Sequence, residues 1–555
     1  MTWIHPLSAG TEQPADILGG KAHGLVTLLR LGLPVPPGFV IGTAACRAHL
    51  RDGRLPDGLA TELRAAVARL EAATGRRLGG PGRPLVVSVR SGGGASMPGM
   101  MNTVLDLGLT PEATAALAAE TGDQRFALDC RLRFLTGFDA ATAPVPIPAP
   151  APAGNEDLTG AIRAAEERIR ERTGRPVPDD AMRQLEAAVA AVFASWDTPR
   201  ARTYRELHGI PHELGTAVTV QAMVYGNRDR RSGSGVAFSR NPNTGAKAPF
   251  GEVLFGRQGD DVVSGRSITR PLADLAAREP AVWAALLDAL GRVEAHYRDA
   301  CHVEFTFEAG ELWILQVRAG GLAGRAAVRV AVDLAGEGVI DRREALLRVS
   351  PDQVRSAGTP RLDAGGAGGA GGMGGLLVRG VGACPGVATG RLATTADLAV
   401  RMAADGPVIL VRPETSPLDL PGLAAAAGVV TARGGPASHA AVVARSMGKP
   451  AVVGAAGLTV DEAAGRVRAG DRVVGEGTII SVDGTGGEVV LGPARLAAAA
   501  ADPHLRRLLA WADEIAAAAP PQGSAATGDP AAKPGLARDA AGRVAAARAA
   551  LMNAS

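Results

Sequence analysis

One stretch decides the fold, Thr431-Ala-Arg-Gly-Gly-Pro-Ala-Ser-His439-Ala-Ala-Val-Val-Ala-Arg445-Ser-Met-Gly-Lys-Pro450-Ala-Val-Val-Gly454. Its pattern predicts a loop, then a short helix, then a strand. Gly434 and Gly435 permit an open, sharply turning backbone, and Ser438 or its neighbour caps a helix that runs to about Met447. His439 is therefore expected in the first helical turn.

That position suits a particular chemistry. Backbone N–H groups in the first turn of a helix lack intrahelical partners, and the helix dipole is positive there. A phosphoryl group on the imidazole of His439 would find donors and a favourable field. The stretch favours a phosphohistidine, with Arg433, Gly434, Gly435 and Ser438 in its loop. The alternative is an ordinary surface or core histidine.

Length and composition limit the class of protein. A chain of 555 residues is too long for one ordinary core and predicts three or four domains. Its 59 basic residues nearly balance 56 acidic ones, which argues against nucleic acid or an anionic membrane as partner. The N-terminus does not read as a secretory signal, no apolar run is long enough to cross a membrane, and four cysteines are widely spaced. We expect a soluble, cytoplasmic protein.

Two glycine-rich blocks in the N-terminal part predict contacts with phosphate. Lys21 follows Gly19 and Gly20 where an amphipathic helix begins, so its ammonium could reach a nucleotide phosphate. Arg90 is expected at the end of a buried strand, on a loop containing residues 92–94, where its planar fork could bridge two phosphate oxygens. The alternatives are a solvated lysine and a plain glycine turn.

The middle of the chain changes from helical to strand patterns. Residues 111–200 are expected to be helical, with a stiff proline-rich interruption at 141–154. From Gly215 the pattern becomes that of strands, and the run that starts at Gln258 is included in it. Glu252 and Gln258 lie beside apolar strands, where they either line a ligand cleft or face solvent at a sheet edge.

A predicted hairpin, turning at Glu308-Ala-Gly-Glu, carries the candidate metal ligands. Alternation places Glu304 on the first strand and Gln316 and Arg318 on one face of the second. A carboxylate beside an amide and an arginine suits Mg²⁺ that bridges triphosphate oxygens. The alternative is a cross-strand pair of Glu304 and Arg318 without a ligand.

These blocks resemble a known family. The stretch around His439 matches the phosphohistidine signature of the pyruvate phosphate dikinase and phosphoenolpyruvate synthase family, with its Gly-Gly pair, Ser-His-Ala-Ala, Ala-Arg and Gly-Lys-Pro. Residues 18–41 and 84–106 resemble the nucleotide-binding half of the same family, and the resemblance covers about residues 15–515. It implies an ATP-grasp domain, a swivelling phosphohistidine domain, ATP as substrate and Mg²⁺ as cofactor.

The resemblance also implies roles for individual residues. His439 is implied as the catalytic phosphohistidine, and Glu304 and Gln316 as metal ligands. The residues implied to bind ATP are Lys21, Arg90, Arg133, Glu252, Gln258, Glu304, Gln316 and Arg318. The chain departs from the family at one position: the family has an aspartate two residues before the glutamate, and this chain has His302. The substitution removes a negative charge from the metal end of the site.

The predicted architecture is α/β and α+β with several domains. They are an ATP-grasp domain over 1–320 with a helical insertion at about 111–200, a helical and glycine-rich linker over 321–375, a β/α/β swivelling domain over 376–493, and a linker helix with a disordered tail over 494–555. Motifs of the family's C-terminal TIM barrel, which binds pyruvate or phosphoenolpyruvate, do not follow residue 515. We therefore expect no barrel.

The expected function is that of a phosphotransferase, which forms a phosphohistidine from ATP and phosphate. As a truncated or split form, it should not convert pyruvate to phosphoenolpyruvate alone, and a separate barrel subunit would supply those partners. A homodimer is one assembly left open. Two alternative functions remain, a nucleotide-binding pseudoenzyme and a phosphocarrier that serves another acceptor.

Overall fold

The computed structural model describes residues 2–95, 97, 99–142, 157–264, 267–322, 324–358, 361–362, 375–493, 496–497, 502–518 and 540–552. The chain divides into two compact units. Unit 1 comprises Met1–Ser234, Phe255–Gly259 and Val303–Val317, and unit 2 comprises Gly235–Leu254, Asp260–His302 and Arg318–Ser555. Nearly all of the predicted proline-rich interruption, most of the glycine-rich linker and residues 519–539 of the tail lie outside the described residues.

An antiparallel five-stranded sheet is the core of unit 1, in the order β1-β2-β7-β5-β6. Its strands are β1 (Ile4–Pro6), β2 (Gly38–Ile41), β5 (Val87–Gly93), β6 (Thr103–Leu107) and β7 (Thr216–Ala222). The central strand β7 is rich in Val and Thr and buried over all but its last residue, as expected for a strand covered on both faces. Two short strands, β3 (Arg77–Leu78) and β4 (Pro84–Leu85), pair separately.

Helices flank this sheet. They are α1 (Ala15–Arg30), α2 (Thr43–Asp52), α3 (Leu59–Thr74), α4 (Pro111–Thr121), α5 (Gln124–Thr142), α6 (Leu158–Thr173), α7 (Ala181–Ala194) and α8 (Pro199–Leu207), with 3₁₀ turns η1 (Ser195–Asp197) and η2 (His212–Leu214). Helices α4 to α8 confirm the predicted helical region. Thr110, Asp157 and Asp180 begin α4, α6 and α7 as side-chain N-caps.

A second five-stranded sheet runs in the order β10-β9-β8-β11-β12. Its strands are β8 (Gly233–Phe238), β9 (Phe250–Phe255), β10 (Arg270–Pro271), β11 (Cys301–Glu308) and β12 (Glu311–Ala319), and its helices are α9 (Gly259–Val263), α10 (Asp274–Arg278) and α11 (Pro280–Tyr297). The predicted hairpin is confirmed, with Ala309 and Gly310 between β11 and β12. The strand predicted from Gln258 is wrong. Asp260 and Asp261 instead lie in the first turn of α9, where the helix dipole favours acidic residues.

The C-terminal part of unit 2 contains the histidine domain, residues 376–491. Its mixed sheet runs in the order β14-β24-β23-β16-β17-β18-β19-β15. The strands are β14 (Leu376–Arg379), β15 (Val381–Cys384), β16 (Val387–Ala393), β17 (Val408–Arg412), β18 (Gly428–Thr431), β19 (Ala451–Val453), β23 (Ile479–Asp483) and β24 (Glu488–Leu491). A meander of β20 (Leu458–Asp461), β21 (Arg466–Ala469) and β22 (Arg472–Gly475) forms a separate three-stranded sheet.

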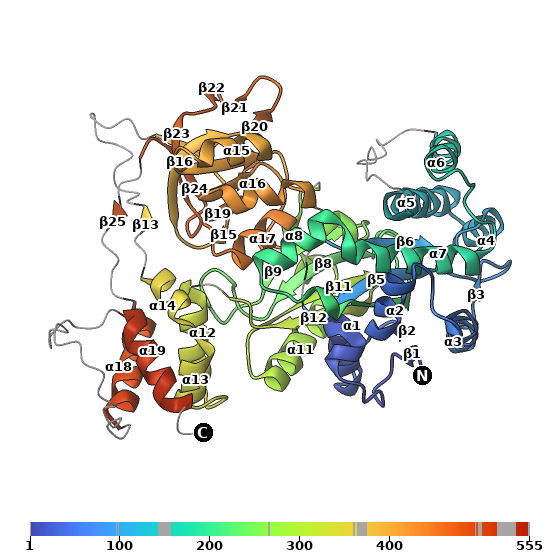
Figure 1. The fold of residues 1–555 in the computed structure, drawn as a ribbon, viewed down its shortest axis with the longest axis horizontal. Helices are drawn as coiled ribbons and strands as arrows, with labels where there is room; N and C mark the ends of the chain where they lie inside the picture. The colour runs from blue at the N-terminus through green and yellow to red at the C-terminus, as the bar shows by residue number, and fades with distance from the viewer. Residues whose placement is uncertain are drawn as a thin grey trace. The chain divides into compact units, whose positions relative to one another are not determined.

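Four strands of the histidine domain, β16 to β19, are parallel neighbours. The connections between them contain α15 (Ala396–Ala403), α16 (Leu420–Ala425) and α17 (His439–Ser446), which Figure 1 shows beside the sheet. Parallel strands need such crossovers because a tight turn cannot join them. The predicted β/α/β character of this domain is confirmed, and its last strand, β24, ends at Leu491.

A bundle of five helices completes unit 2. Its members are α12 (Gly324–Gly336), α13 (Arg342–Arg348), α14 (Pro351–Ala357), α18 (Pro503–Ala518) and α19 (Ala540–Met552), which lie together in Figure 1. Val544 and Ala547 of α19 are fully buried in the core of the bundle. Arg543 pairs with Asp513 of α18. The prediction of a disordered tail is therefore wrong for residues 540–552, because their apolar residues three apart form one face.

Two short strands adjoin the bundle. Residues Arg361–Leu362 (β13) and Leu496–Ala497 (β25) pair antiparallel. Within the described ranges the sheets are open, and no closed α/β barrel is formed. No described helix has both the length and the apolar character that crossing a membrane requires.

Candidate functional site

The predicted order of loop, helix and strand around His439 is confirmed. We call residues 432–438 the histidine loop; it joins β18 to α17, whose first residue is His439. Ser438 is the N-cap, with an extended backbone (φ −63°, ψ 159°), but its side chain does not accept a capping hydrogen bond. Among the described residues, the buried Ser438 hydroxyl has no hydrogen-bond partner. The start of α17 thus keeps polar groups that a phosphoryl group could engage.

The two nitrogens of the His439 ring differ in their surroundings. Nδ1 lies 3.0 Å from Oγ1 of Thr415, within hydrogen-bond distance. Nε2 is buried and has no hydrogen-bond partner in the described part of the chain. Burial lowers the pKa of His439 to about 4, although the Asp419 carboxylate acts in the opposite direction. The imidazole is therefore neutral near pH 7, as a nucleophile must be.

Thr415 is a site residue that the sequence reasoning did not single out. It follows β17 and is 5% exposed. The next residue, Ser416, caps η4 (Pro417–Asp419) in a capping box with Asp419. The Asp419 carboxylate in turn forms an ion pair with Arg412, at 3.2 Å. These contacts fix the loop that presents the threonine hydroxyl to the ring.

The two positions of the histidine loop that carry glycine require it for different reasons. Gly434 has a φ of 90°, which disfavours any residue with a Cβ. Gly435 lies against Glu252, and a Cβ built on it would be 1.7 Å from Oε2 of that carboxylate. Arg433, the remaining residue predicted in the loop, is half exposed and forms an ion pair of 2.6 Å with Glu414.

Glu252 lies in β9 and is 2% exposed. Its Oε2 accepts a hydrogen bond of 2.6 Å from the Thr269 hydroxyl, and its Oε1 accepts one of 2.8 Å from the backbone N–H of Ala437. Burial raises the pKa of Glu252, while these two donors and Arg445 counteract the increase. The structure therefore brings Glu252 to the histidine loop, whereas the sequence analysis placed it with the ATP ligands.

The phosphate-binding residues predicted in unit 1 are gathered by helix α1. The helix is kinked at Gly19, whose φ is 75°, and a Cβ on Gly19 would be 1.6 Å from the carbonyl oxygen of Gly92. A Cβ on Gly92 would in turn lie 3.2 Å from that of Lys21. On the other side, a Cβ on Gly24 would be 3.0 Å from Val317 of β12. Close backbone packing thus places Lys21 beside the glycines of β5.

Arg90 was predicted at the end of its strand, and this is wrong because β5 continues to Gly93. The residue lies within the strand and is 9% exposed. Its guanidinium donates to Oε1 of Gln221 on β7 and, at 3.3 Å, to the carbonyl oxygen of Leu315 on β12. Strand β5 extends beyond Arg90 because Gly92 and Gly93, which suggested a loop, also fit an extended strand and pair with β7. Arg90 consequently links β5 to the strand that carries Gln316.

The candidate metal ligands lie on paired strands of unit 1. Nε2 of Gln316 donates a hydrogen bond of 3.0 Å to Oε1 of Glu304. Two oxygen-bearing side chains fit Mg²⁺, because proteins that bind it with phosphates often supply only one or two carboxylates and leave the other positions to phosphate and water. No group of three or more His, Cys, Asp or Glu residues suited to a metal is found in the described ranges.

Two further residues of β11 and β12 belong to unit 2. Arg318 is two residues beyond Gln316, on the same side of β12. His302 is two residues before Glu304, and its ring lies 5.1 Å from that of Phe238. Burial lowers the pKa of His302 to about 3, and the guanidiniums of Arg318 and Arg445 lower it further. A neutral imidazole therefore occupies the position where the family resemblance implies an aspartate.

Arg133 and Gln258, predicted to bind ATP, are linked through a polar network in unit 1. Arg133 pairs with Asp129 at 3.0 Å, and the Asn227 amide donates to the same carboxylate at 3.3 Å. Gln258 donates to Oδ1 of Asn227 at 3.2 Å and to Oδ1 of the buried Asp106 at 3.4 Å. Asp106, Asp129 and Asn227 were not predicted. Asp106 and Asp129 are single polar residues between apolar ones, Asn227 precedes a run of charged residues, and none of the three has a distinctive spacing.

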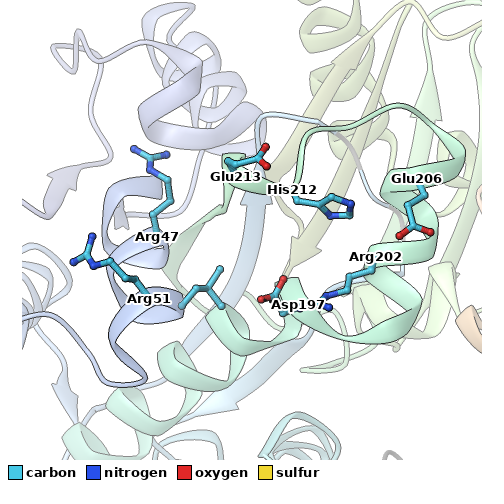
Figure 2. A pocket seen from close by; sticks show the side chains of 8 residues that line it. Arg47, Arg51, Asp197, Arg202, Glu206, His212 and Glu213 are labelled. Carbon is cyan, nitrogen blue, oxygen red and sulfur yellow. Dashed lines mark ion pairs between the residues drawn. The ribbon is translucent and has the colours of Figure 1, made fainter.

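A separate surface cavity of about 520 Å³ lies in unit 1. It is lined by Arg47, Leu50, Arg51, Asp197, Arg202, Glu206, His212 and Glu213. Figure 2 shows Arg47 and Arg51 on α2 across from the side chains of η1 and α8. None of the predicted site residues lines this cavity, and its acidic and basic groups balance, as in the ion pair of Arg202 with Asp197 at 3.4 Å.

Two families match separate parts of the chain. The family described as "Pyruvate phosphate dikinase, AMP/ATP-binding domain" matches residues 48–271, and that described as "PEP-utilising enzyme, mobile domain" matches residues 404–487. The second range includes His439 and Thr415, whereas the first includes Arg90, Arg133, Glu252 and Gln258. The two matches together define the class of protein that this chain resembles: proteins that combine an AMP/ATP-binding domain with a mobile domain of PEP-utilising enzymes.

Within this class, the chain is similar to pyruvate, phosphate dikinases. It is 40% identical over 545 residues to the pyruvate, phosphate dikinase of Rhizobium meliloti (strain 1021), an alignment that covers 92% of this chain and 60% of the relative. It is also 40% identical over 526 residues to pyruvate, phosphate dikinase 2 of Zea mays, with coverage of 92% and 59%. The chain thus spans about three fifths of the length of these curated relatives.

Proposed function

We propose that the chain is an ATP-dependent phosphotransferase that forms a phosphohistidine at Nε2 of His439. The observation that carries the proposal is the state of this ring: it is neutral, it starts a helix, one nitrogen contacts Thr415, and the other has no hydrogen-bond partner among the residues that the structure describes. A hydrogen bond from Nδ1–H to the threonine oxygen would leave the lone pair on Nε2. The match to an AMP/ATP-binding domain supports ATP as the donor.

The first chemical step transfers a pyrophosphoryl group. Nε2 attacks the β-phosphorus of ATP, the bond from that phosphorus to the oxygen of AMP breaks, and AMP leaves with the electron pair. Inorganic phosphate then takes the outer phosphoryl group as pyrophosphate and leaves one phosphoryl group on the ring. Transfers of this kind are accelerated chiefly by positioning and by neutralising charge on oxygens that are not transferred.

We propose that an ATP-grasp domain supplies those positioning groups. Lys21 beside the glycines of β5, Arg90 within β5 and Arg318 on β12 provide positive charge, while Arg133 and Gln258 belong to one polar network. Glu304 and Gln316 would hold Mg²⁺, which when bound supplies positive charge to the triphosphate oxygens. His302 adds no negative charge there, so we expect weaker Mg²⁺ binding than an aspartate would give.

We further propose that the interconversion of pyruvate and phosphoenolpyruvate requires a barrel domain of the family's kind. In an assay of this 555-residue chain alone, that domain must be added as a separate protein. The proposed location is the cytoplasm. Its support is that all four cysteines are buried free thiols, as is usual in a reducing compartment.

The test is incubation with Mg²⁺, phosphate and ATP labelled at the β-phosphate. We expect an acid-labile, base-stable label on the protein, which His439→Asn abolishes. The matched control is His296→Asn, because His296 lies exposed on α11 and outside the proposed site. If the wild-type protein binds ATP but takes up no label, the proposal fails in favour of a nucleotide-binding pseudoenzyme.

A further inference from the structure

We propose that the surface cavity lined by α2, η1, α8 and η2 is a second binding site, and that it takes a phosphorylated sugar, either free or as the ribose phosphate of a mononucleotide. The residues that line the cavity all belong to unit 1. None of the residues predicted to bind ATP is among them. The inference therefore does not depend on the proposed chemistry of His439.

A fully buried arginine, Arg205 of α8, supports the wall of the cavity from behind. Its guanidinium lies over the ring of Trp196, 4.3 Å from the centroid, and its Nε donates a hydrogen bond of 3.0 Å to Nδ1 of His212. Among the described residues its Nη2 has no hydrogen-bond partner, and it lies 3.6 Å from Oδ1 of Asp197. Burying a guanidinium is costly unless it is well partnered. The cost is incurred here beside two side chains, His212 and Asp197, that line the cavity.

His212 is exposed, yet it is held at two points. Arg205 fixes its ring, and its carbonyl oxygen accepts a hydrogen bond of 2.8 Å from Nε1 of Trp196. Because Nδ1 is the acceptor for Arg205, the neutral ring carries its proton on Nε2 and can donate from there. Exposed side chains usually change rotamer freely, whereas binding residues are held in place by a supporting layer. His212 has the support expected of a binding residue.

Helix α2 forms the opposite wall of the cavity. Its Arg47 and Arg51 are about one helical turn apart, and Figure 2 shows both across from η1 and α8. Nη1 of Arg47 donates a hydrogen bond of 3.1 Å to the carbonyl oxygen of Leu214, which ties α2 to η2. A Cβ on the next residue, Gly215, would lie 3.2 Å from Cγ of Arg47. The two walls are thus packed together, with two arginines on one side whose planar groups suit phosphate oxygens.

The charges of the lining indicate the class of ligand. Asp197 is the counter-ion of both Arg202, at 3.4 Å, and Arg205, at 3.6 Å, so positive charge exceeds negative charge in this group of three and an anion is favoured nearby. Glu206 and Glu213 also line the cavity, and ionised carboxylates can only accept hydrogen bonds, as from ligand hydroxyls. A volume of about 520 Å³ is in the range of small-molecule sites. A phosphorylated sugar supplies an anion and several hydroxyls at that size.

The first experiment is calorimetry of the full chain with ribose 5-phosphate, in the presence of a saturating non-hydrolysable ATP analogue that occupies any ATP site. We expect one site per chain, and Arg51→Ala should weaken binding at least about tenfold, because charge-assisted hydrogen bonds to phosphate are lost. Arg51 is exposed, so the variant should fold. The matched control is Arg64→Ala, an exposed position on α3 outside the cavity. Absence of binding at millimolar concentration, or equal affinity in Arg51→Ala and wild type, would overturn the proposal.

The second experiment separates the sugar from the phosphate and identifies the source of the ligand. Glu206→Gln should weaken binding of ribose 5-phosphate about threefold to tenfold and leave that of inorganic phosphate unchanged. The control is Glu112→Gln, at an exposed position in the first turn of α4. Tighter binding of AMP than of ribose 5-phosphate would identify a mononucleotide, and equal or weaker binding a free sugar phosphate. If inorganic phosphate binds wild type as tightly as ribose 5-phosphate, the site takes an anion only and the proposal is overturned.

The third experiment distinguishes a binding role of His212 from a structural one. His212→Phe keeps a ring but removes the Nε2 donor, so the affinity for ribose 5-phosphate should fall at least about fivefold. The melting temperature should fall as well, because Nε of the buried Arg205 loses its acceptor. His296→Phe, at an exposed position on α11, is the control and should change neither quantity. A lower melting temperature with unchanged affinity would show that His212 only supports the fold, and would contradict the proposal.

Discussion

Thr415 and His439 are joined by one contact of 3.0 Å, between the threonine Oγ1 and the imidazole Nδ1. The two residues come from different connections of the same mixed sheet, after β17 and after β18. This contact orients the ring and, when Nδ1–H is the donor, selects the tautomer whose lone pair is on Nε2. It therefore controls the nucleophile that we propose.

We predict that Thr415→Val lowers the single-turnover rate of His439 labelling by about tenfold to a hundredfold, because a misoriented nucleophile loses much of its rate. Valine has nearly the shape of threonine and cannot accept the hydrogen bond. Thr415→Ser, which keeps the hydroxyl, is the control and should stay within about threefold of wild type. Equal rates for the valine and serine variants would show that the hydroxyl does not position the ring.

The second prediction concerns pH. Because burial lowers the pKa of His439 to about 4 from an ordinary value of 6.5, the nucleophile stays unprotonated between these values. In single-turnover measurements, the labelling rate should decrease as the pH is lowered, with a midpoint near pH 4. An acid limb centred near pH 6.5 would be incompatible with the buried, neutral ring.

The same shift affects stability. Between pH 6.5 and 4 the unfolded chain binds a proton at His439 and the folded chain does not, so the contribution of this residue to stability falls as the pH is lowered. His439→Asn should remove that contribution and flatten the pH dependence of the unfolding midpoint in this range. The measurement is chemical denaturation at half-unit pH steps.

The third prediction tests the packing of α1 against β5. Gly19→Ala places a Cβ 1.6 Å from the carbonyl oxygen of Gly92 at a φ of 75°, so the helix must move and carry Lys21 with it. We expect a loss of ATP affinity of at least tenfold and a lower melting temperature. The control Gly75→Ala has a similar φ of 65° but meets nothing within 4 Å, and should cost only about 1–2 kcal/mol of stability.

The fourth prediction concerns the metal. Glu304→Gln removes the charge that would attract Mg²⁺ but keeps the shape of the side chain. It should raise the Mg²⁺ concentration needed for half-maximal ATP binding at least about tenfold. The exposed Glu311 on the same hairpin provides the control Glu311→Gln. The idea fails if both variants show the same Mg²⁺ dependence in calorimetry.

The fifth prediction concerns helix α19. Val544→Asp buries a charge in the core of the helix bundle, where Val544 is fully buried, and should lower the free energy of unfolding by about 3 kcal/mol or more. Ala545→Asp changes the adjacent exposed position and should alter it by less than about 1 kcal/mol. Equal melting temperatures for the two variants would show that α19 does not pack as described.

The sequence predicts elements whose signals are local. The start of α17 at His439, the hairpin at Ala309 and Gly310, and the helices of residues 111–200 follow from glycines, caps and periodicity, and the structure confirms them. Local sequence signals predict the wrong structure where contacts between distant residues determine the element that forms. The glycines after Arg90 continue β5 because β7 pairs with them, and residues 540–552 form a helix that packs on α18.

The site residues also divide into those with a local sequence pattern and those whose role depends on tertiary contacts. His439 and its loop have a dense sequence pattern and could be predicted. Thr415 could not be given its role, because the hydrogen bond to His439 spans 24 residues and depends on how two connections of the sheet meet. The contact of Glu252 with Ala437 spans 185 residues, and only the tertiary structure reveals it.

The pairing of β13 with β25 makes the histidine domain an insert whose entry and exit points are neighbours. Arg361 faces Ala497 and Leu362 faces Leu496, while helices from before and after the insert share one bundle. The bundle can therefore close around the insert whatever its length, since the entropic cost of closing a loop grows only slowly with the number of residues. We therefore expect that the domain between these two strands can be replaced by a short linker, or by a relative's domain, while the bundle still folds.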